Sequence, residues 1–199
     1  KFARDKIIKK HGKFLTYDVT PFYIYKPIVA KRIFELSPKA KIISNLRNPV
    51  DRAYSNYILM LQNGGTTKTF EEVIQISMDK IDKNKLKLND EAYLVNTFDE
   101  NILARGFYVD QLKIWFEKFQ KKQLLIIPSE DLAQKTNEIL AKVFEFLDLP
   151  YFKIKDFTKH NKREYLPMKN ETRELLIEFY QPYNEKLYSL ISQHFDWDK

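Results

Sequence analysis

The sequence has no cysteine and few histidines. Without cysteine the chain can form no disulfide, and it offers neither a thiolate metal ligand nor a thiol nucleophile. The histidines, His11, His160 and His194, are scattered without the spacing that metal ligands require. We therefore expect no metal centre in this protein.

Long hydrophobic runs are also missing. No stretch approaches the roughly 18 apolar residues of a membrane-spanning helix, and no secretory signal peptide opens the sequence. We therefore expect no membrane span in this chain. Hydrophobic residues nevertheless make up 44% of the 199 residues, and aromatic residues make up 15%. This composition can build one substantial core, so we predict a single domain over residues 1–199.

The formal net charge of +7 favours anionic partners. A nucleotide, an acidic or sulfated glycan and a nucleic acid all fit that charge, and a general richness in lysine explains it equally well. The basic residues are dispersed, and no nucleic-acid recognition motif is present. A nucleic acid is therefore not the partner that we expect.

The segment most indicative of function runs from Lys41 to Tyr57 and reads KIISNLRNPVDRAYSNY. Its mostly apolar, partly β-branched run over 42–46 predicts a buried strand. Asn48 can cap a helix, and Pro49 suits the first helical position because that position needs no amide hydrogen. The segment therefore predicts a strand, a sharp turn and a helix.

Arg47 stands at the predicted carboxyl end of this strand, where open α/β sheets usually bind ligands. Its guanidinium offers forked donors that match phosphate oxygens, and Ser55 adds a hydroxyl donor. These residues indicate an anion site. An equally good interpretation from pattern alone is that Arg47 pairs with Asp51 and that Ser55 is simply solvated.

The sequence of this segment resembles a segment of sulfotransferases that use 3′-phosphoadenosine-5′-phosphosulfate (PAPS). The residues that carry the resemblance are L-R-N-P-V-D-R-A-Y-S-N-Y. In that family an Arg at the strand end and a Ser eight residues later hold the 3′-phosphate, and Arg47 and Ser55 match these positions. The resemblance is closest to the branch of carbohydrate (heparan-type) and bacterial sulfotransferases. It implies a P-loop-NTPase-like fold. It also implies that the sulfonate transfer requires no metal ion.

The stretch from Phe14 to Val19 predicts a further strand, which Thr20-Pro21 ends. Asp18-Val19-Thr20-Pro21 resembles a family element in which a strand ends in an acidic residue followed by Ser/Thr-Pro. Many members have Glu followed by Lys or Ser there, and this sequence departs from that pattern. The resemblance makes Asp18 a candidate general base or substrate orienter, although an Asp before Thr-Pro is also a common turn former.

The remaining periodicity predicts one more buried strand and several amphipathic helices. The strand is expected over 124–127, and Glu130 and Asp131 after it are interpreted as structural carboxylates. The helices are expected over 28–36, 70–81, 108–119 and 137–147, with a last one from 170 that Pro182 should kink or split. Alternating strands and helices predict a three-layer α/β/α domain with a mainly parallel sheet.

Two loops invite opposite interpretations. The glycines of Gln62–Lys68 follow a helix rather than a strand, so we interpret that loop as a helix end and not as a phosphate loop. The basic loop from Lys159 to Met168 is, by itself, an ordinary surface loop. The family resemblance instead implies that it closes over the nucleotide, with Lys162 and Arg163 as the binding residues.

The function that the resemblance implies is transfer of a sulfonate from PAPS to a hydroxyl or amine of an acceptor, with a carbohydrate favoured. Nothing before Phe14 resembles the family's N-terminal loop for the 5′-phosphosulfate. Either the chain is a fragment without that loop, or it is a divergent member that cannot catalyse. We favour a fragment that is inactive alone, located in the cytoplasm if bacterial or in the Golgi lumen if eukaryotic. The alternatives are a non-catalytic nucleotide- or sulfated-glycan-binding domain and a fragment of a P-loop kinase.

Overall fold

The computed structural model describes residues 15–84, 102–154 and 166–197. In these ranges the sheet consists of two parallel strands, β1 (Ile42–Leu46) and β2 (Leu124–Pro128). The helices of the described residues are α2 (Pro27–Leu36), α3 (Pro49–Gln62), α4 (Phe70–Asn84), α7 (Tyr108–Lys118), α8 (Ser129–Gln134), α9 (Thr136–Phe146) and α10 (Asn170–Ile191), with short 3-10 turns η1 (Ala104–Gly106) and η2 (Lys121–Gln123).

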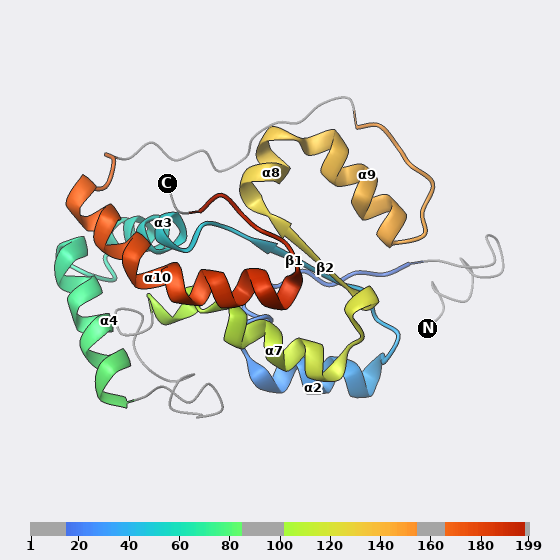
Figure 1. The fold of residues 1–199 in the computed structure, drawn as a ribbon, viewed down its shortest axis with the longest axis horizontal. Helices are drawn as coiled ribbons and strands as arrows, with labels where there is room; N and C mark the ends of the chain where they lie inside the picture. Colours follow the sequence, from blue (N-terminus) through green and yellow to red (C-terminus); the bar gives the residue numbers. More distant parts are fainter. Residues whose placement is uncertain (1–14, 85–101, 155–165, 198–199) are drawn as a thin grey trace.

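The helices enclose the strand pair from both sides. Figure 1 shows α8 and α9 above the strands and α2, α7 and α10 below or in front of them, while α3 and α4 lie at one end. Helices α8 and α9 contact β2, and α7 contacts both α2 and α10. This is the three-layer α/β/α arrangement predicted from the alternation of strands and helices.

Most elements fall where the sequence pattern predicts them. Strands over 42–46 and 124–128 are observed, and each predicted helix begins and ends within a few residues of its expected bounds. Helix α4 starts with a reciprocal cap, because the Thr69 N–H donates to Glu72 Oε2 at 2.7 Å and the Glu72 N–H donates to Thr69 Oγ1 at 3.3 Å. The short helix α8 was not predicted.

The predicted strand over 14–19 is wrong for its described part, because residues 15–19 form no strand. The alternating apolar side chains of Leu15, Tyr17 and Val19 are 63%, 91% and 77% exposed. A strand needs a neighbouring strand and a face to bury, and this segment has neither among the described residues. Its β propensity is therefore not realised.

Pro182 does not split the last helix, which runs unbroken from Asn170 to Ile191. The ribbon of α10 changes direction along its length in Figure 1, as a kink would require. Proline deprives the carbonyl four residues earlier of its helical partner. Pro182 and Glu178 both lie on the exposed side of α10, where water can satisfy that carbonyl.

The glycine-containing loop after α3 is a helix end, as predicted. Gly64 has a left-handed φ of 69°, and its N–H donates to the Leu61 carbonyl at 3.2 Å. The Gly65 N–H donates to the Met60 carbonyl at 2.8 Å. These two bonds form a Schellman motif, which satisfies carbonyls at the end of the helix and leaves no phosphate-binding loop here.

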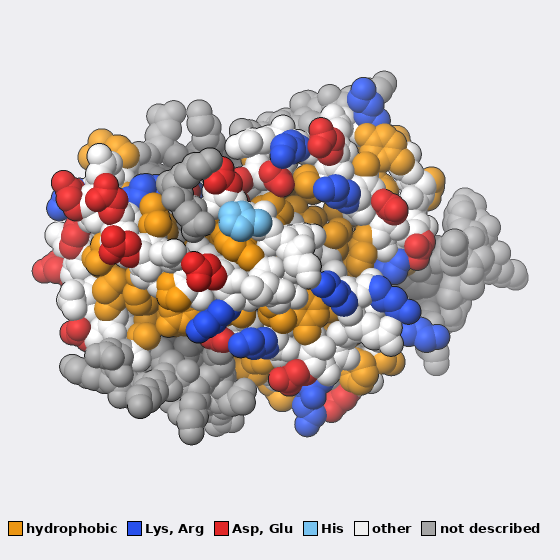
Figure 2. Space-filling view, viewed as in Figure 1, with side chains coloured by type: hydrophobic (Ala, Val, Ile, Leu, Met, Phe, Trp, Pro, Cys, Tyr) orange, Lys and Arg blue, Asp and Glu red, His pale blue; other side chains and the backbone are white. Residues whose placement is uncertain are grey.

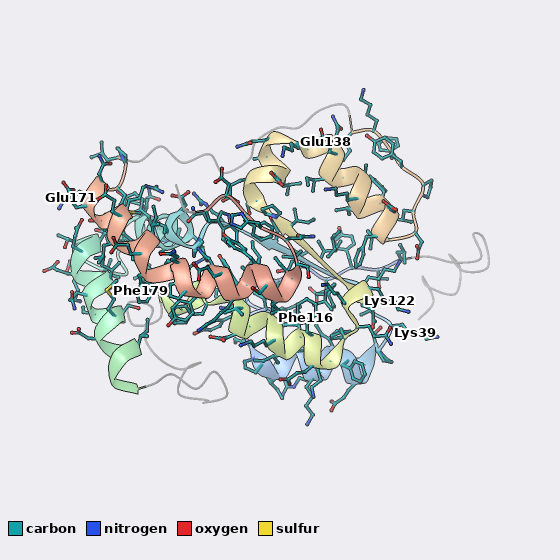
Figure 3. All side chains as sticks on the ribbon, in the orientation of Figure 1. Lys39, Phe116, Lys122, Glu138, Glu171 and Phe179 are labelled. Atoms are coloured by element: carbon teal, nitrogen blue, oxygen red, sulfur yellow. The ribbon has the colours of Figure 1, made fainter. Side chains whose placement is uncertain are left out.

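The amino ends of the two strands carry lysines. The Gln123 side chain donates to the carbonyls of Pro38 and Ala40, at 2.9 and 3.1 Å, and so joins the loops that precede β1 and β2. Lys39 and Lys122 lie close together at this end in Figure 3. Figure 2 shows Lys and Arg predominating on this half of the face, while Asp and Glu gather over α4 and the start of α10.

A close approach of backbone to ring joins η1 to α10. A Cβ built on Gly106 would lie 2.7 Å from Tyr180 Cε1. Tyr180 cannot move away easily, because it is fully buried and its hydroxyl donates to the Leu103 carbonyl at 2.7 Å. The absence of a side chain at residue 106 is thus a packing requirement.

We expect Gly106→Ala to lower the stability of the fold by about 1–3 kcal/mol, because the added methyl overpacks a rigid site. Thermal or urea unfolding measures the change. Gly64→Asn is the control, since no atom lies within 4 Å of a Cβ there and Asn tolerates the left-handed conformation. Equal stability losses in the two variants would contradict this account.

Candidate functional site

The site begins where the two parallel strands end. Leu46 of β1 is opposite Pro128 of β2, so the residues that follow each strand emerge side by side at one edge of the sheet. Arg47-Asn48 leads from β1 into α3, and Ser129-Glu130 begins α8. The same register places Asn48 beside Glu130, and the Asn48 N–H donates to Glu130 Oε1 at 2.9 Å.

The turn between β1 and α3 is held by hydrogen bonds at nearly every polar group. The Arg47 carbonyl accepts from the Tyr108 hydroxyl at 3.0 Å. Asn48 Oδ1 caps α3 by accepting from the Val50 N–H at 2.9 Å, and Asn48 Nδ2 donates to the Trp197 carbonyl at 3.2 Å. The backbone at Arg47 is therefore fixed before any ligand binds.

The Arg47 side chain, in contrast, is available. It is half-buried, and within the described ranges its guanidinium has no carboxylate partner and no hydrogen bond. The pairing of Arg47 with Asp51 considered above does not occur. Asp51 instead pairs with Arg173 of α10, with 2.6 Å between Asp51 Oδ1 and Arg173 Nη2.

Ser55 lies on α3, eight residues after Arg47, and is half-buried. Its hydroxyl makes no hydrogen bond to any described residue. Two nitrogens of the same helix, Arg52 Nε and Asn56 Nδ2, are buried without a hydrogen-bond partner. Arg52 does use its Nη2 to donate to the Ile102 carbonyl. Donors thus accumulate along this side of α3 without a matching set of acceptors.

Tyr108 is the buried centre of this charged group. Burial raises the pKa of Tyr108, and the positive charges of Arg52 and Arg47 oppose that shift while Glu130 adds to it. The Tyr108 hydroxyl therefore stays protonated at neutral pH and can serve as a hydrogen-bond donor. Arg105, close before Tyr108 in the sequence, places its guanidinium carbon 5.3 Å from the ring centres of both Phe22 and Tyr25.

Asp18 does not join this group. It is exposed, and its carboxylate accepts from the Tyr23 hydroxyl at 2.8 Å across the turn that follows it. The structure shows no ion pair between Asp18 and Arg47. The position fits the turn-forming interpretation, and a catalytic role for Asp18 stays a prediction.

The predicted nucleotide-binding residues Lys162 and Arg163 lie outside the described residues. The chain that follows them is anchored beside the site: the Leu166 carbonyl accepts from the Tyr54 hydroxyl at 2.9 Å, and Tyr54 directly precedes Ser55. Only two residues separate Arg163 from Leu166 in the sequence.

The start of α10 is then held to α4. Glu71 accepts from the Thr172 hydroxyl at 3.0 Å and lies 3.4 Å from Lys169 Nζ. Burial by itself would raise the pKa of Glu71, but the hydrogen bonds from its own backbone and from Thr172, together with Lys169, bring that pKa below its ordinary value. These contacts fix the segment that leads from residue 166 into α10.

Sequence reasoning gave Trp197 no role. It interpreted Glu130 as structural, which its contacts fit, but it did not place Glu130 at this turn. Trp197 Nε1 donates to Glu130 Oε2 at 3.2 Å, so the Glu130 carboxylate joins the β1–α3 turn to the carboxyl-terminal segment. Asn48 and Trp197 are 149 positions apart in the sequence, and no local sequence pattern predicts a contact over that separation.

Comparison with known proteins identifies the class that this fold and site define. Residues 27–186 match the family model described as the sulfotransferase domain, which is most of the chain. The chain belongs to the sulfotransferase domain family. The predicted family is thereby confirmed.

Several of the similar proteins are named as carbohydrate, heparan sulfate or bacterial sulfotransferases, the branch that the sequence resembles. Mouse carbohydrate sulfotransferase 15 is 29% identical over 83% of this chain, and human heparan sulfate glucosamine 3-O-sulfotransferase 3B1 is 28% identical over 92%. The membrane-associated sulfotransferase kil1 of Dictyostelium discoideum is 27% identical over 90%. The crystal structure of a sulfotransferase from Alicyclobacillus acidocaldarius superposes with a TM-score of 0.67 at 27% identity over 89% of this chain.

The chain is shorter than these proteins. It spans 52% of the Dictyostelium protein, 32% of the mouse enzyme, 50% of the human enzyme and 65% of the bacterial structure. None of the helices described here combines the length and apolarity that crossing a membrane requires. Among the described residues, no three His, Asp or Glu side chains gather in a way that could hold a metal ion.

The anchor of α10 on α4 should be sensitive to acid. Because the folded state lowers the pKa of Glu71 below 4.5, its contacts stabilise the protein above that pH and are lost as the pH falls through the lowered value. We expect Glu71→Gln to lower the melting temperature slightly at pH 7 and by less at about pH 3.5. Glu174→Gln, on the exposed side of α10, is the control. A pH-independent difference would contradict the assigned contacts.

Proposed function

We propose that this protein binds PAPS and transfers its sulfonate to a hydroxyl or amine of a carbohydrate. The observation that carries this proposal is the Arg47 guanidinium at the carboxyl end of β1, fixed at its backbone and without a carboxylate partner in the described ranges. Membership of the sulfotransferase domain family supports the reaction class.

The electrostatics around Arg47 suit a phosphate. A carboxylate in the first turn of α3 would compete with an anion for Arg47, but Arg173 neutralises Asp51 at 2.6 Å. The half-buried guanidinium is thus left to the ligand, in a partly desolvated place where charge-assisted hydrogen bonds are strong. Arg47 and Ser55 would hold the 3′-phosphate, as the resemblance implies.

The reaction is a displacement at sulfur. The acceptor oxygen or nitrogen forms a bond to sulfur while the bond between sulfur and the 5′-phosphate oxygen breaks, and 3′,5′-ADP leaves. The acceptor proton passes to a base, for which Asp18 is the candidate by resemblance. Lys162 and Arg163 are proposed, on the same resemblance, to contact the nucleotide.

The names of two relatives support a carbohydrate acceptor. The mouse and human proteins that match this chain are named as sulfotransferases of carbohydrate and of heparan sulfate glucosamine. The formal charge of +7 agrees with an acidic polymer as acceptor.

The binding half of the proposal has a direct test. Titration with 3′,5′-ADP should raise the melting temperature by mass action, and 5′-AMP should raise it much less. Arg47→Ala and Ser55→Ala should each weaken 3′,5′-ADP binding, Arg47→Ala by about ten- to a hundredfold because a charged hydrogen-bond donor is lost. Arg47→Lys should recover only part of the affinity, since it keeps the charge but not the fork.

Matched controls remove the same groups elsewhere. Arg32→Ala on the exposed face of α2 and Ser189→Ala on α10 should leave 3′,5′-ADP binding unchanged. If Arg47→Ala binds 3′,5′-ADP as the unmodified protein does, the 3′-phosphate site is not at the end of β1.

The transfer half is measured as 3′,5′-ADP released from PAPS in the presence of desulfated heparan sulfate. We expect Asp18→Asn to lower kcat by roughly a hundredfold or more, as loss of a general base does, while the affinity for 3′,5′-ADP stays the same. Tyr23→Phe, which removes the hydrogen bond to Asp18 but keeps its carboxylate, is the control. An active Asp18→Asn variant excludes Asp18 as the base. Nucleotide binding without any transfer would agree with the inactive fragment expected from the sequence and with the alternative of a nucleotide-binding domain.

A further inference from the structure

The carboxyl-terminal segment closes on the turn that carries Arg47. Trp197 is 2% exposed and reaches the turn through two hydrogen bonds, from its indole to Glu130 and from Asn48 to its carbonyl. Glu130 uses its other oxygen to accept the Asn48 N–H. Glu130, Trp197 and Asn48, which we name the clasp, therefore form a closed cycle of hydrogen bonds.

The clasp also contacts Tyr108, the second residue that holds the backbone at Arg47. The Trp197 ring packs against Tyr108 with 5.9 Å between ring centres, and the Tyr108 hydroxyl holds the Arg47 carbonyl. Phe195 and Tyr188 complete the aromatic setting of Trp197 at 4.8 and 6.2 Å. Among the described residues, the side chains outside α3 that hydrogen-bond to the backbone of Arg47 and Asn48 are thus Tyr108 and Glu130 of the clasp.

We propose that Glu130 and Trp197 are positioning residues for the 3′-phosphate site, so that docking of the carboxyl-terminal segment and binding of a 3′-phosphorylated nucleotide strengthen each other. This inference rests on the proposed function. Its physical basis is that a guanidinium binds an anion tightly only when its backbone is already in place, and that coupling between two binding events is reciprocal.

The Glu130→Gln variant distinguishes a positioning role of Glu130 from a purely electrostatic effect of its charge. Glu130→Gln removes a negative charge near Arg47, and electrostatics alone would then tighten the binding of an anion. The two groups that Glu130 binds are both N–H donors on different oxygens, and a glutamine has only one oxygen to offer. One donor is left unpaired, so positioning predicts weaker binding instead.

The sequence offers a matched control for Trp197. The only other tryptophan, Trp115, is also buried and also donates from its indole, to the Ile24 carbonyl at 3.3 Å. Trp115→Phe therefore replaces an equivalent indole in the same core by a smaller ring and removes its hydrogen bond, without a change at Glu130 or Asn48. Any general loss of packing affects both variants, whereas loss of the clasp affects only Trp197→Phe.

The first experiment measures dissociation constants of 3′,5′-ADP and 5′-AMP for the unmodified protein, Trp197→Phe, Glu130→Gln and Trp115→Phe. We expect 3′,5′-ADP to bind about threefold more weakly to Trp197→Phe and on the order of tenfold more weakly to Glu130→Gln. The affinity for 5′-AMP should change little in either variant. Trp115→Phe should keep the preference for 3′,5′-ADP.

The second experiment measures the coupling in the other direction, that is, the effect of nucleotide binding on the docking of the carboxyl-terminal segment. In Trp115→Phe, Trp197 is the sole tryptophan, so acrylamide quenching of its fluorescence reports opening of the clasp. We expect 3′,5′-ADP to reduce the quenching constant on the order of twofold, and 5′-AMP to leave it unchanged. This measurement requires no substitution in the clasp, so it stands even if Trp197→Phe does not fold.

The outcomes separate this inference from the proposed function. Three results would overturn the positioning role while leaving Arg47 as the phosphate ligand. They are equal 3′,5′-ADP affinities in Trp197→Phe and Trp115→Phe, tighter 3′,5′-ADP binding to Glu130→Gln, and a quenching constant that does not change when the nucleotide is added. If the unmodified protein itself shows no preference for 3′,5′-ADP over 5′-AMP, the proposed function fails, and this inference fails with it.

Discussion

The register of the parallel pair β1–β2 is the constraint on which the site depends. With Leu46 opposite Pro128, the residues two places beyond each strand meet as Asn48 and Glu130. A shift of one residue would turn the side chains of β1 to the opposite face and would carry Arg47 away from Tyr108. The sheet therefore fixes the place of a cation at its carboxyl edge, and the helices only refine it.

Charge is distributed so that Arg47 remains uncommitted. Several other cations near the site have partners of their own: Arg173 pairs with Asp51, Lys169 pairs with Glu71, and Arg52 donates to the Ile102 carbonyl. Arg47 has no such partner among the described residues. A cation with a rigid backbone and a free guanidinium carries little reorganisation cost when an anion arrives. That contrast, more than the net charge, is what suits this edge of the sheet to phosphate.

The local patterns were reliable where hydrogen bonds are local. The segment KIISNLRNPVDRAYSNY indicated the strand, the cap at Asn48 and the helix, and the glycines after α3 indicated a helix end. They failed at residues 15–19, whose alternation suits a strand but whose apolar side chains stay exposed. A helix satisfies its hydrogen bonds within itself, whereas a strand depends on a neighbour that its own sequence does not specify.

The sequence by itself determined the family, the order of the elements and the candidate ligand Arg47, because each depends on residues close together in the chain. Only the tertiary structure decided which groups surround Arg47. Nothing local separates Asp51 as a partner of Arg47 from Asp51 as a partner of Arg173, 122 residues away. The same holds for Glu130 and Trp197, which meet Asn48 only after β1 and β2 pair and the carboxyl-terminal segment packs on Tyr108. Such contacts depend on burial and on long loop closures, which no short pattern encodes.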